Sequence, residues 1–133
     1  MQGTANFMID IKTIVRSISF AFQGLFYVLR TQNNARFHSF ATLIVVGLGI
    51  WLQLNFLQWC IIIIAIGMVW VTECFNTSIE KLFDLVNPAS NPLVKYGKDA
   101  GAAAVLISAF LGILLGILVM GPLLYLRILS LFK

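Results

Sequence analysis

Hydrophobic residues near the start of the chain recur at intervals of three and four positions. One face carries Phe7, Ile11, Ile14, Ile18, Phe22, Leu25 and Leu29. Another face carries Lys12, Arg16, Ser19, Gln23 and Arg30. This spacing predicts an amphipathic helix over about residues 7–31 that lies in a membrane interface. The same apolar face also suits packing against the body of the protein.

Three longer apolar runs follow this amphipathic segment. They cover about residues 40–57, 59–85 and 99–126, and each is long enough to cross a hydrocarbon core of roughly 30 Å. Residues 31–39 are polar and predict a turn before the first span, while the first and second spans form an antiparallel hairpin. We therefore expect an all-α integral membrane fold with three transmembrane helices and an N-terminal amphipathic surface helix, forming a single domain over residues 1–133.

The composition agrees with a membrane location. Hydrophobic residues make up 60% of the chain and charged residues 11%, and the mean hydropathy is +0.96. Ordinary soluble domains have about 45–50% apolar and about 25% charged residues, so this class is excluded. The net charge of +4 points to membrane topology and anionic lipid headgroups, and not to nucleic acid.

The basic residues predict which side of the membrane each segment faces. Two lie at the far end of the chain, and the other seven are Lys12, Arg16, Arg30, Arg36, Lys81, Lys95 and Lys98. Because cytoplasmic segments are enriched in lysine and arginine, we expect the amino terminus and the connection between the second and third spans to face the cytoplasm.

Four polar residues near the cytoplasmic end of the second span share one helical face. Residues 59–71 carry no charge, and Glu73, Asn76, Glu80 and Asp84 then follow at helical spacing. An ionisable side chain at membrane depth costs roughly 2.5–3.5 kcal/mol or more, so a function is the expected reason for this polar stripe.

The depths of the two glutamates favour different tasks. Glu80 is two helical turns, ~10 Å, nearer the cytoplasm than Glu73. A lipid hydroxyl arriving from the bilayer would meet Glu73, which suits a general base, and a phosphate donor arriving from the cytoplasm would meet Glu80, which suits a Mg²⁺ ligand. Lys98 precedes the third span, whose free N–H groups favour anions. Together these residues predict phosphoryl transfer to a lipid alcohol.

Each of these residues also has a simpler explanation. Glu73 suits a structural carboxylate at a subunit contact, and Glu80 and Asp84 suit a solvated helix end. Lys98 and Asp99 suit a lysine extended to the interface and a helix cap.

Two other functional classes compete with the kinase. One is a small oligomeric ion or proton pathway, and the other is a non-catalytic membrane scaffold. The clustering of Asn76, Glu80, Lys98 and Asp99 argues against both, because a pathway needs polar groups along its whole length.

Three segments resemble the prokaryotic diacylglycerol kinase family, which includes undecaprenol kinases. They are Glu73–Asp84 (ECFNTSIEKLFD), Lys98–Leu106 (KDAGAAAVL) and Asn34–His38, which is similar to the family's Asn-x-Arg-x-His stretch. The resemblance covers about residues 16–115. It implies a homotrimer in the bacterial inner membrane, with sites between subunits on the cytoplasmic side that use ATP and a divalent metal such as Mg²⁺.

The resemblance also implies roles for individual residues. Glu73 matches the family's general base and Glu80 a metal ligand. Asn76, Lys98 and Asp99 match positions around the ATP phosphates.

One departure from the family pattern concerns the metal. Gln32 stands where better-known members carry a glutamate that shares the metal with the residue matching Glu80, so we expect a weaker ligand there. Arg36 and His38 are candidates for substrate contacts or for lipid-headgroup anchors. Nothing in the apolar sequence distinguishes diacylglycerol from undecaprenol as the lipid substrate.

Overall fold

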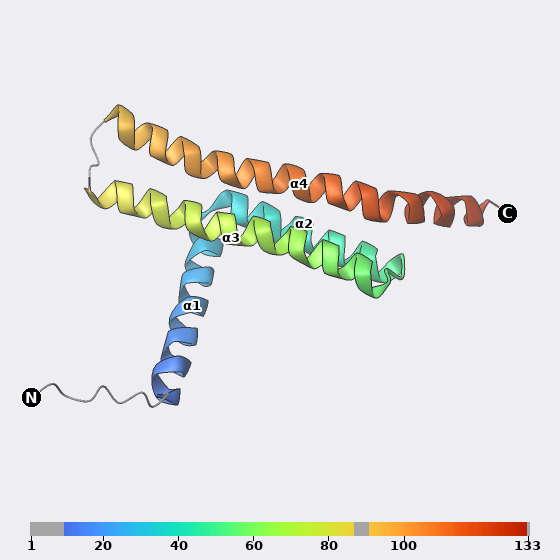
Figure 1. The fold of residues 1–133 in the computed structure, drawn as a ribbon, viewed down its shortest axis with the longest axis horizontal. Coiled ribbons are helices and arrows are strands. Elements are labelled where there is room, and N and C mark those ends of the chain that lie inside the picture. Colours follow the sequence, from blue (N-terminus) through green and yellow to red (C-terminus); the bar gives the residue numbers. More distant parts are fainter. Residues whose placement is uncertain (1–9, 87–90, 133) are drawn as a thin grey trace, which may run out of the picture.

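The computed structural model describes residues 10–86 and 91–132, which form four helices and no strand. The helices are α1 (Ile11–Thr31), α2 (Asn33–Trp51), α3 (Phe56–Val86) and α4 (Pro92–Leu131). The long helices α3 and α4 run side by side in opposite directions, α2 packs along α3, and α1 leaves this group at a steep angle (Figure 1). The prediction of an all-α fold is confirmed.

The start of α2 differs from the prediction. The helix begins at Asn33, so most of the stretch expected to be a turn is helical, and Gln32 alone separates α1 from α2. Residues 33–39 contain no proline or glycine, and the Ser39 hydroxyl donates to the Ala35 carbonyl within the helix. The polar composition there therefore marks one end of α2 and not a break in it.

The boundaries of the other spans also shift for local reasons. Asn55 and Gln58 exchange backbone-to-side-chain hydrogen bonds of 2.9 and 3.0 Å, a capping box that starts α3 at Phe56. The predicted first span therefore ends at Trp51 instead of residue 57. The Asn91 side chain accepts from the Leu93 N–H and Pro92 fits the first helical turn, so α4 begins seven residues before the predicted start at 99.

The buried core lies at the end of the molecule where α2 turns into α3. Leu52, Leu54, Ile62 and Met120 form it. Gly49 lies against Trp59 so closely that a Cβ there would be 2.8 Å from the indole ring. This packing fixes the α2–α3 hairpin against α4.

Most large apolar side chains of α3 and α4 point outward. Ile63, Ile64, Phe110 and Ile117 are each about 60% or more exposed. Within the described part of the chain, α3 and α4 are long and apolar enough to cross a membrane, with mean hydropathies of 1.9 and 2.7. Surfaces of this kind are typical of lipid-facing helices.

Among the described residues, helix α1 is buried against the other helices near its carboxyl end, at Val28. Its start is capped by Asp10, which accepts from the Lys12 N–H and the Thr13 hydroxyl, and the Thr13 bond lowers the pKa of Asp10. Residues 7–9 of the predicted surface helix lie outside the described residues. The apolar side chains of α1 remain largely exposed.

Candidate active site

Glu80 lies at the centre of a group of polar side chains where α1, α2 and α3 meet. Gln32 donates from Nε2 to Glu80 Oε2 at 3.2 Å, and Asn76 donates from Nδ2 to Glu80 Oε1 at 3.1 Å. Both carboxylate oxygens are therefore held by side-chain amides. Three residues predicted from the sequence to share a site, Gln32, Asn76 and Glu80, are in contact.

The corner between α1 and α2 brings Gln32 to this position. Val28 before the corner and Ala35 after it are both buried. The Arg36 guanidinium donates to the Leu29 and Arg30 carbonyls at the end of α1. Arg36, predicted as a candidate for a substrate contact, therefore stabilises the corner that places Gln32 beside Glu80 in the described structure.

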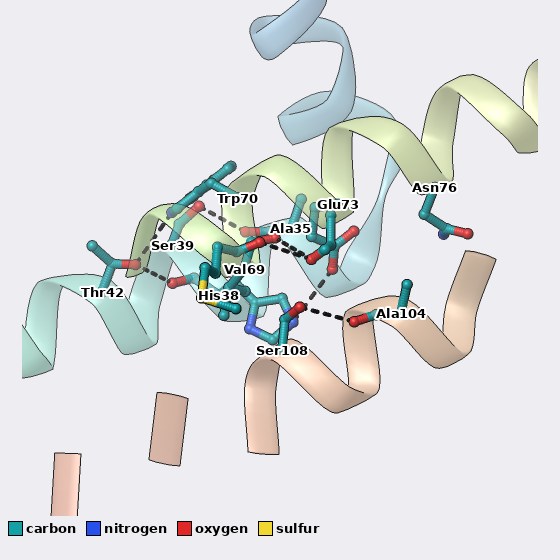
Figure 2. Close-up of polar contacts among 12 residues, drawn as sticks. Ala35, His38, Ser39, Thr42, Val69, Trp70, Glu73, Asn76, Ala104 and Ser108 are labelled. Carbon is teal, nitrogen blue, oxygen red and sulfur yellow. Dashed lines mark hydrogen bonds and ion pairs between the residues drawn. The ribbon is translucent and has the colours of Figure 1, made fainter. Parts of the chain in front are cut away.

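Glu73 lies one helical turn before Asn76 on α3 and faces α2. It is 1% exposed, and its Oε1 is 3.3 Å from His38 Nε2 (Figure 2). The two atoms are close enough for an ion pair but are not aligned for a hydrogen bond, and Glu73 Oε1 has no hydrogen-bond partner among the described residues. Because a buried carboxylate oxygen without a hydrogen-bond donor is costly, Glu73 at this position favours a functional role.

Two further buried oxygens near Glu73 on α3 lack partners in the described structure. They are Asn76 Oδ1 and Thr77 Oγ1. Thr77 was not predicted as a site residue, although it lies four positions after Glu73 and so one turn along the same helix. Gly101 of α4 lies against Asn76, where an added Cβ would be 2.4 Å from Oδ1. Glycine at this position therefore lets α4 approach the polar stripe.

Lys98 and Asp99 lie in the first turns of α4. Lys98 Nζ is 2.5 Å from Asp84 Oδ1, and Lys81 reaches the other oxygen of Asp84 at 3.5 Å. Asp99 is exposed. Lys98 is thus paired with Asp84, the last residue of the stripe, and not with Glu80.

An apolar groove of about 380 Å³ extends from His38 between α2, α3 and α4. Its lining includes Phe37, His38, Thr42, Ile62, Gly112 and Met120. The volume is in the range of sites that bind small organic molecules, about 300–1,000 Å³. Glu73 therefore lies beside the polar end of a groove suited to an apolar chain.

The side chains around Glu80 suit a hard cation held jointly with a ligand. Within residues 10–86 and 91–132, no group of three or more His, Cys, Asp or Glu side chains is placed to hold a metal ion. Glu80 offers a carboxylate, and the amides of Gln32 and Asn76 turn their nitrogens to it. Rotation of these amides would turn their oxygens to a cation at Glu80, and Asn76 Oδ1 has no hydrogen-bond partner among the described residues. Because Mg²⁺ commonly binds one or two carboxylates together with substrate phosphates, this set fits it.

The chain is similar to known proteins over most of its length. The chain is 33% identical over 113 residues to the undecaprenol kinase of Bacillus subtilis (strain 168), covering 85% of this chain and 92% of that protein. It is 32% identical over 114 residues to a diacylglycerol kinase of Synechocystis, covering 84% of this chain and 65% of that protein. The diacylglycerol kinase of Escherichia coli (strain K12) is 25% identical over 101 residues, or 76% of this chain and 83% of that protein. Residues 19–120 match the family model described as prokaryotic diacylglycerol kinase, so the chain belongs to that family.

Proposed function

We propose that the protein transfers the γ-phosphoryl group of ATP to the hydroxyl of undecaprenol or diacylglycerol, giving undecaprenyl phosphate or phosphatidic acid. Its family makes the protein a bacterial membrane lipid kinase. The observation that carries the proposal is the placement of two carboxylates on one face of α3. Glu73 is buried beside the apolar groove, and Glu80 is held by amides nearer the end of the helix.

In the proposed reaction Glu73 accepts the proton of the lipid hydroxyl. The lipid oxygen forms a bond to the γ-phosphorus, the bond from that phosphorus to the bridging oxygen breaks, and ADP leaves with the electron pair. Glu80, Asn76 and Gln32 would hold Mg²⁺, which when bound neutralises charge on the phosphates. Lys98 and Asp99 lie on the first turns of α4. An ATP phosphate there would compete with Asp84 for the ammonium group of Lys98.

The proposal includes a membrane arrangement. Helices α2, α3 and α4 span the bacterial inner membrane, α1 lies in its cytoplasmic interface, and three copies assemble with sites between subunits. The exposed apolar side chains of all four helices support contact with lipid or with other copies. The clustering of basic residues in α1, the α1–α2 corner and the start of α4 supports a cytoplasmic location for Glu80.

Cysteine labelling tests the sidedness of this arrangement. In a variant whose Cys60 and Cys74 are replaced by alanine, a single cysteine at Asn91 should react with an impermeant reagent only from the cytoplasmic side. One placed at Gln53 should react only from the outside. The cysteine-free protein is the control, and the reverse labelling would separate Glu80 from cytoplasmic ATP and contradict the proposed reaction.

The activity itself is tested with purified protein in detergent micelles. ATP consumption and the phosphorylated lipid are measured with undecaprenol and diacylglycerol offered separately, and with neither lipid as the control. Lipid-dependent ADP formation with either alcohol supports the proposal and identifies the preferred acceptor. No phosphorylation of either lipid would overturn it.

A further inference from the structure

His38, the single histidine of the chain, lies where the apolar groove meets Glu73. We propose that it is a positioning residue, whose Nε2–H donates to one oxygen of Glu73 and so leaves the other oxygen directed at the lipid hydroxyl. This inference rests on the proposed function. It assigns His38 a task that acts through Glu73, distinct from the substrate or headgroup contact expected from the sequence.

A chain of hydrogen bonds fixes His38 opposite Glu73. Trp70 of α3 donates from Nε1 to Thr42 Oγ1 at 3.3 Å, and the Thr42 hydroxyl donates to the His38 carbonyl at 2.7 Å (Figure 2). Trp70 precedes Glu73 by three positions, so the same turn of α3 carries the carboxylate and the group that holds α2. The Trp70–Thr42 hydrogen bond therefore fixes α2 against α3 near His38 and Glu73.

Several hydroxyl groups on the helices around Glu73 donate to backbone carbonyls of their own helices, among them Ser39, Thr42 and Ser108 in Figure 2. The pairs are Ser39 to Ala35, Thr42 to His38, Thr72 to Met68 and Val69, and Ser108 to Ala104. The Thr77 hydroxyl, one turn from Glu73 on α3, has no hydrogen-bond partner among the described residues and makes none with Glu73. His38 Nε2, 3.3 Å from Glu73 Oε1, is the side-chain nitrogen that the described structure brings to this carboxylate. At this distance the imidazole can donate a hydrogen bond to Oε1 by a change of orientation, without moving closer.

A single hydrogen bond to Glu73 would have a chemical purpose. A buried carboxylate without a donor can rotate and present either oxygen, whereas one held at Oε1 offers Oε2 as the proton acceptor in a fixed direction. The imidazole also lines the groove, so it lies beside the path of an apolar chain that brings a hydroxyl to Glu73. The competing role for His38 is a positive counter-charge to Glu73.

Two substitutions separate these roles. His38→Phe keeps a ring but removes the hydrogen-bond donor. It should lower kcat for lipid phosphorylation by about 10-fold to 100-fold, the size of effect seen when a residue that orients a metal ligand is lost. The KM for ATP should stay unchanged, because the amides around Glu80 are untouched. His38→Gln supplies a neutral N–H and should recover most of the turnover.

The results distinguish failure of the inference from failure of the proposed function. A His38→Phe variant that turns over at the wild-type rate would overturn the inference alone. A His38→Gln variant as slow as His38→Phe would also overturn it, because a positive charge at this position would then be the requirement. A wild-type protein that phosphorylates neither lipid would overturn both.

A second measurement works even where His38→Phe does not fold. Because the chain has one histidine, ¹⁵N-imidazole NMR of the full-length protein reports on His38 alone. Glu73→Gln should move its Nε2 signal. Thr42→Val, which removes the hydroxyl, should also move it, whereas Thr42→Ser should leave it in place. An Nε2 signal unaffected by Glu73→Gln would overturn the inference.

Discussion

Replacing Glu73 by glutamine should lower lipid phosphorylation by about 100-fold or more, because the variant keeps the shape of the side chain but cannot accept the hydroxyl proton. The KM for ATP should change little, since Gln32, Asn76 and Glu80 keep their contacts. Steady-state kinetics with saturating lipid and varied ATP measure both quantities.

Thermal unfolding of the same variant supplies the control. Glu73 is 1% exposed, and its Oε1 has no hydrogen-bond partner among the described residues. A neutral amide there removes a buried charge, so the unfolding temperature should stay equal or rise while turnover collapses. Near-normal turnover, or a loss of activity that follows a loss of stability, would make Glu73 a structural carboxylate.

Helical periodicity predicted one contact among these polar residues correctly and could not predict another. Asn76 and Glu80 are four positions apart on one helix, and the structure joins them by a hydrogen bond. Asp84 continues the spacing, yet it pairs with Lys98 across the α3–α4 connection. Spacing within one helix specifies a shared face, but the neighbouring helix determines which partner each residue on that face meets.

The contact between His38 and Glu73 also depends on a neighbouring helix and not on spacing within one helix. The two residues are separated by 35 positions, and their meeting depends on how α2 packs along α3. Thr77 could not be predicted for a related reason. A threonine inside a helix commonly donates to the carbonyl four positions earlier, and only the folded structure shows its hydroxyl without a partner in the described part of the chain.

The start of α2 shows a limit of composition as a guide. Residues 31–39 contain asparagine, glutamine and serine, which favour turns when they flank apolar runs. Here Arg36 binds the end of α1 through side-chain hydrogen bonds, so a single residue, Gln32, suffices for the change of direction. The sequence therefore predicted a change of direction within residues 31–39, but not that Gln32 alone makes it.

Gln32 supports the last prediction, because the structure places its amide nitrogen 3.2 Å from Glu80 Oε2. Gln32→Glu would put a second carboxylate at this position, and the two negative charges would favour a bound cation. We expect a several-fold lower Mg²⁺ concentration for half-maximal activity. Glu80→Gln should nearly abolish activity, since no carboxylate would then remain beside Gln32 and Asn76. The double variant should recover part of the loss.

Gln23→Glu is a matched control for this prediction, because it makes the same chemical change at an exposed position of α1. Its Mg²⁺ dependence should equal that of the wild type, which separates a ligand at Gln32 from a general effect of added negative charge. If Gln32→Glu behaves like Gln23→Glu, then Gln32 acts only as a hydrogen-bond donor that holds Glu80 at the α1–α2 corner. In that case Glu80 alone supplies the carboxylate, and the charge that holds Mg²⁺ must come from the ATP phosphates.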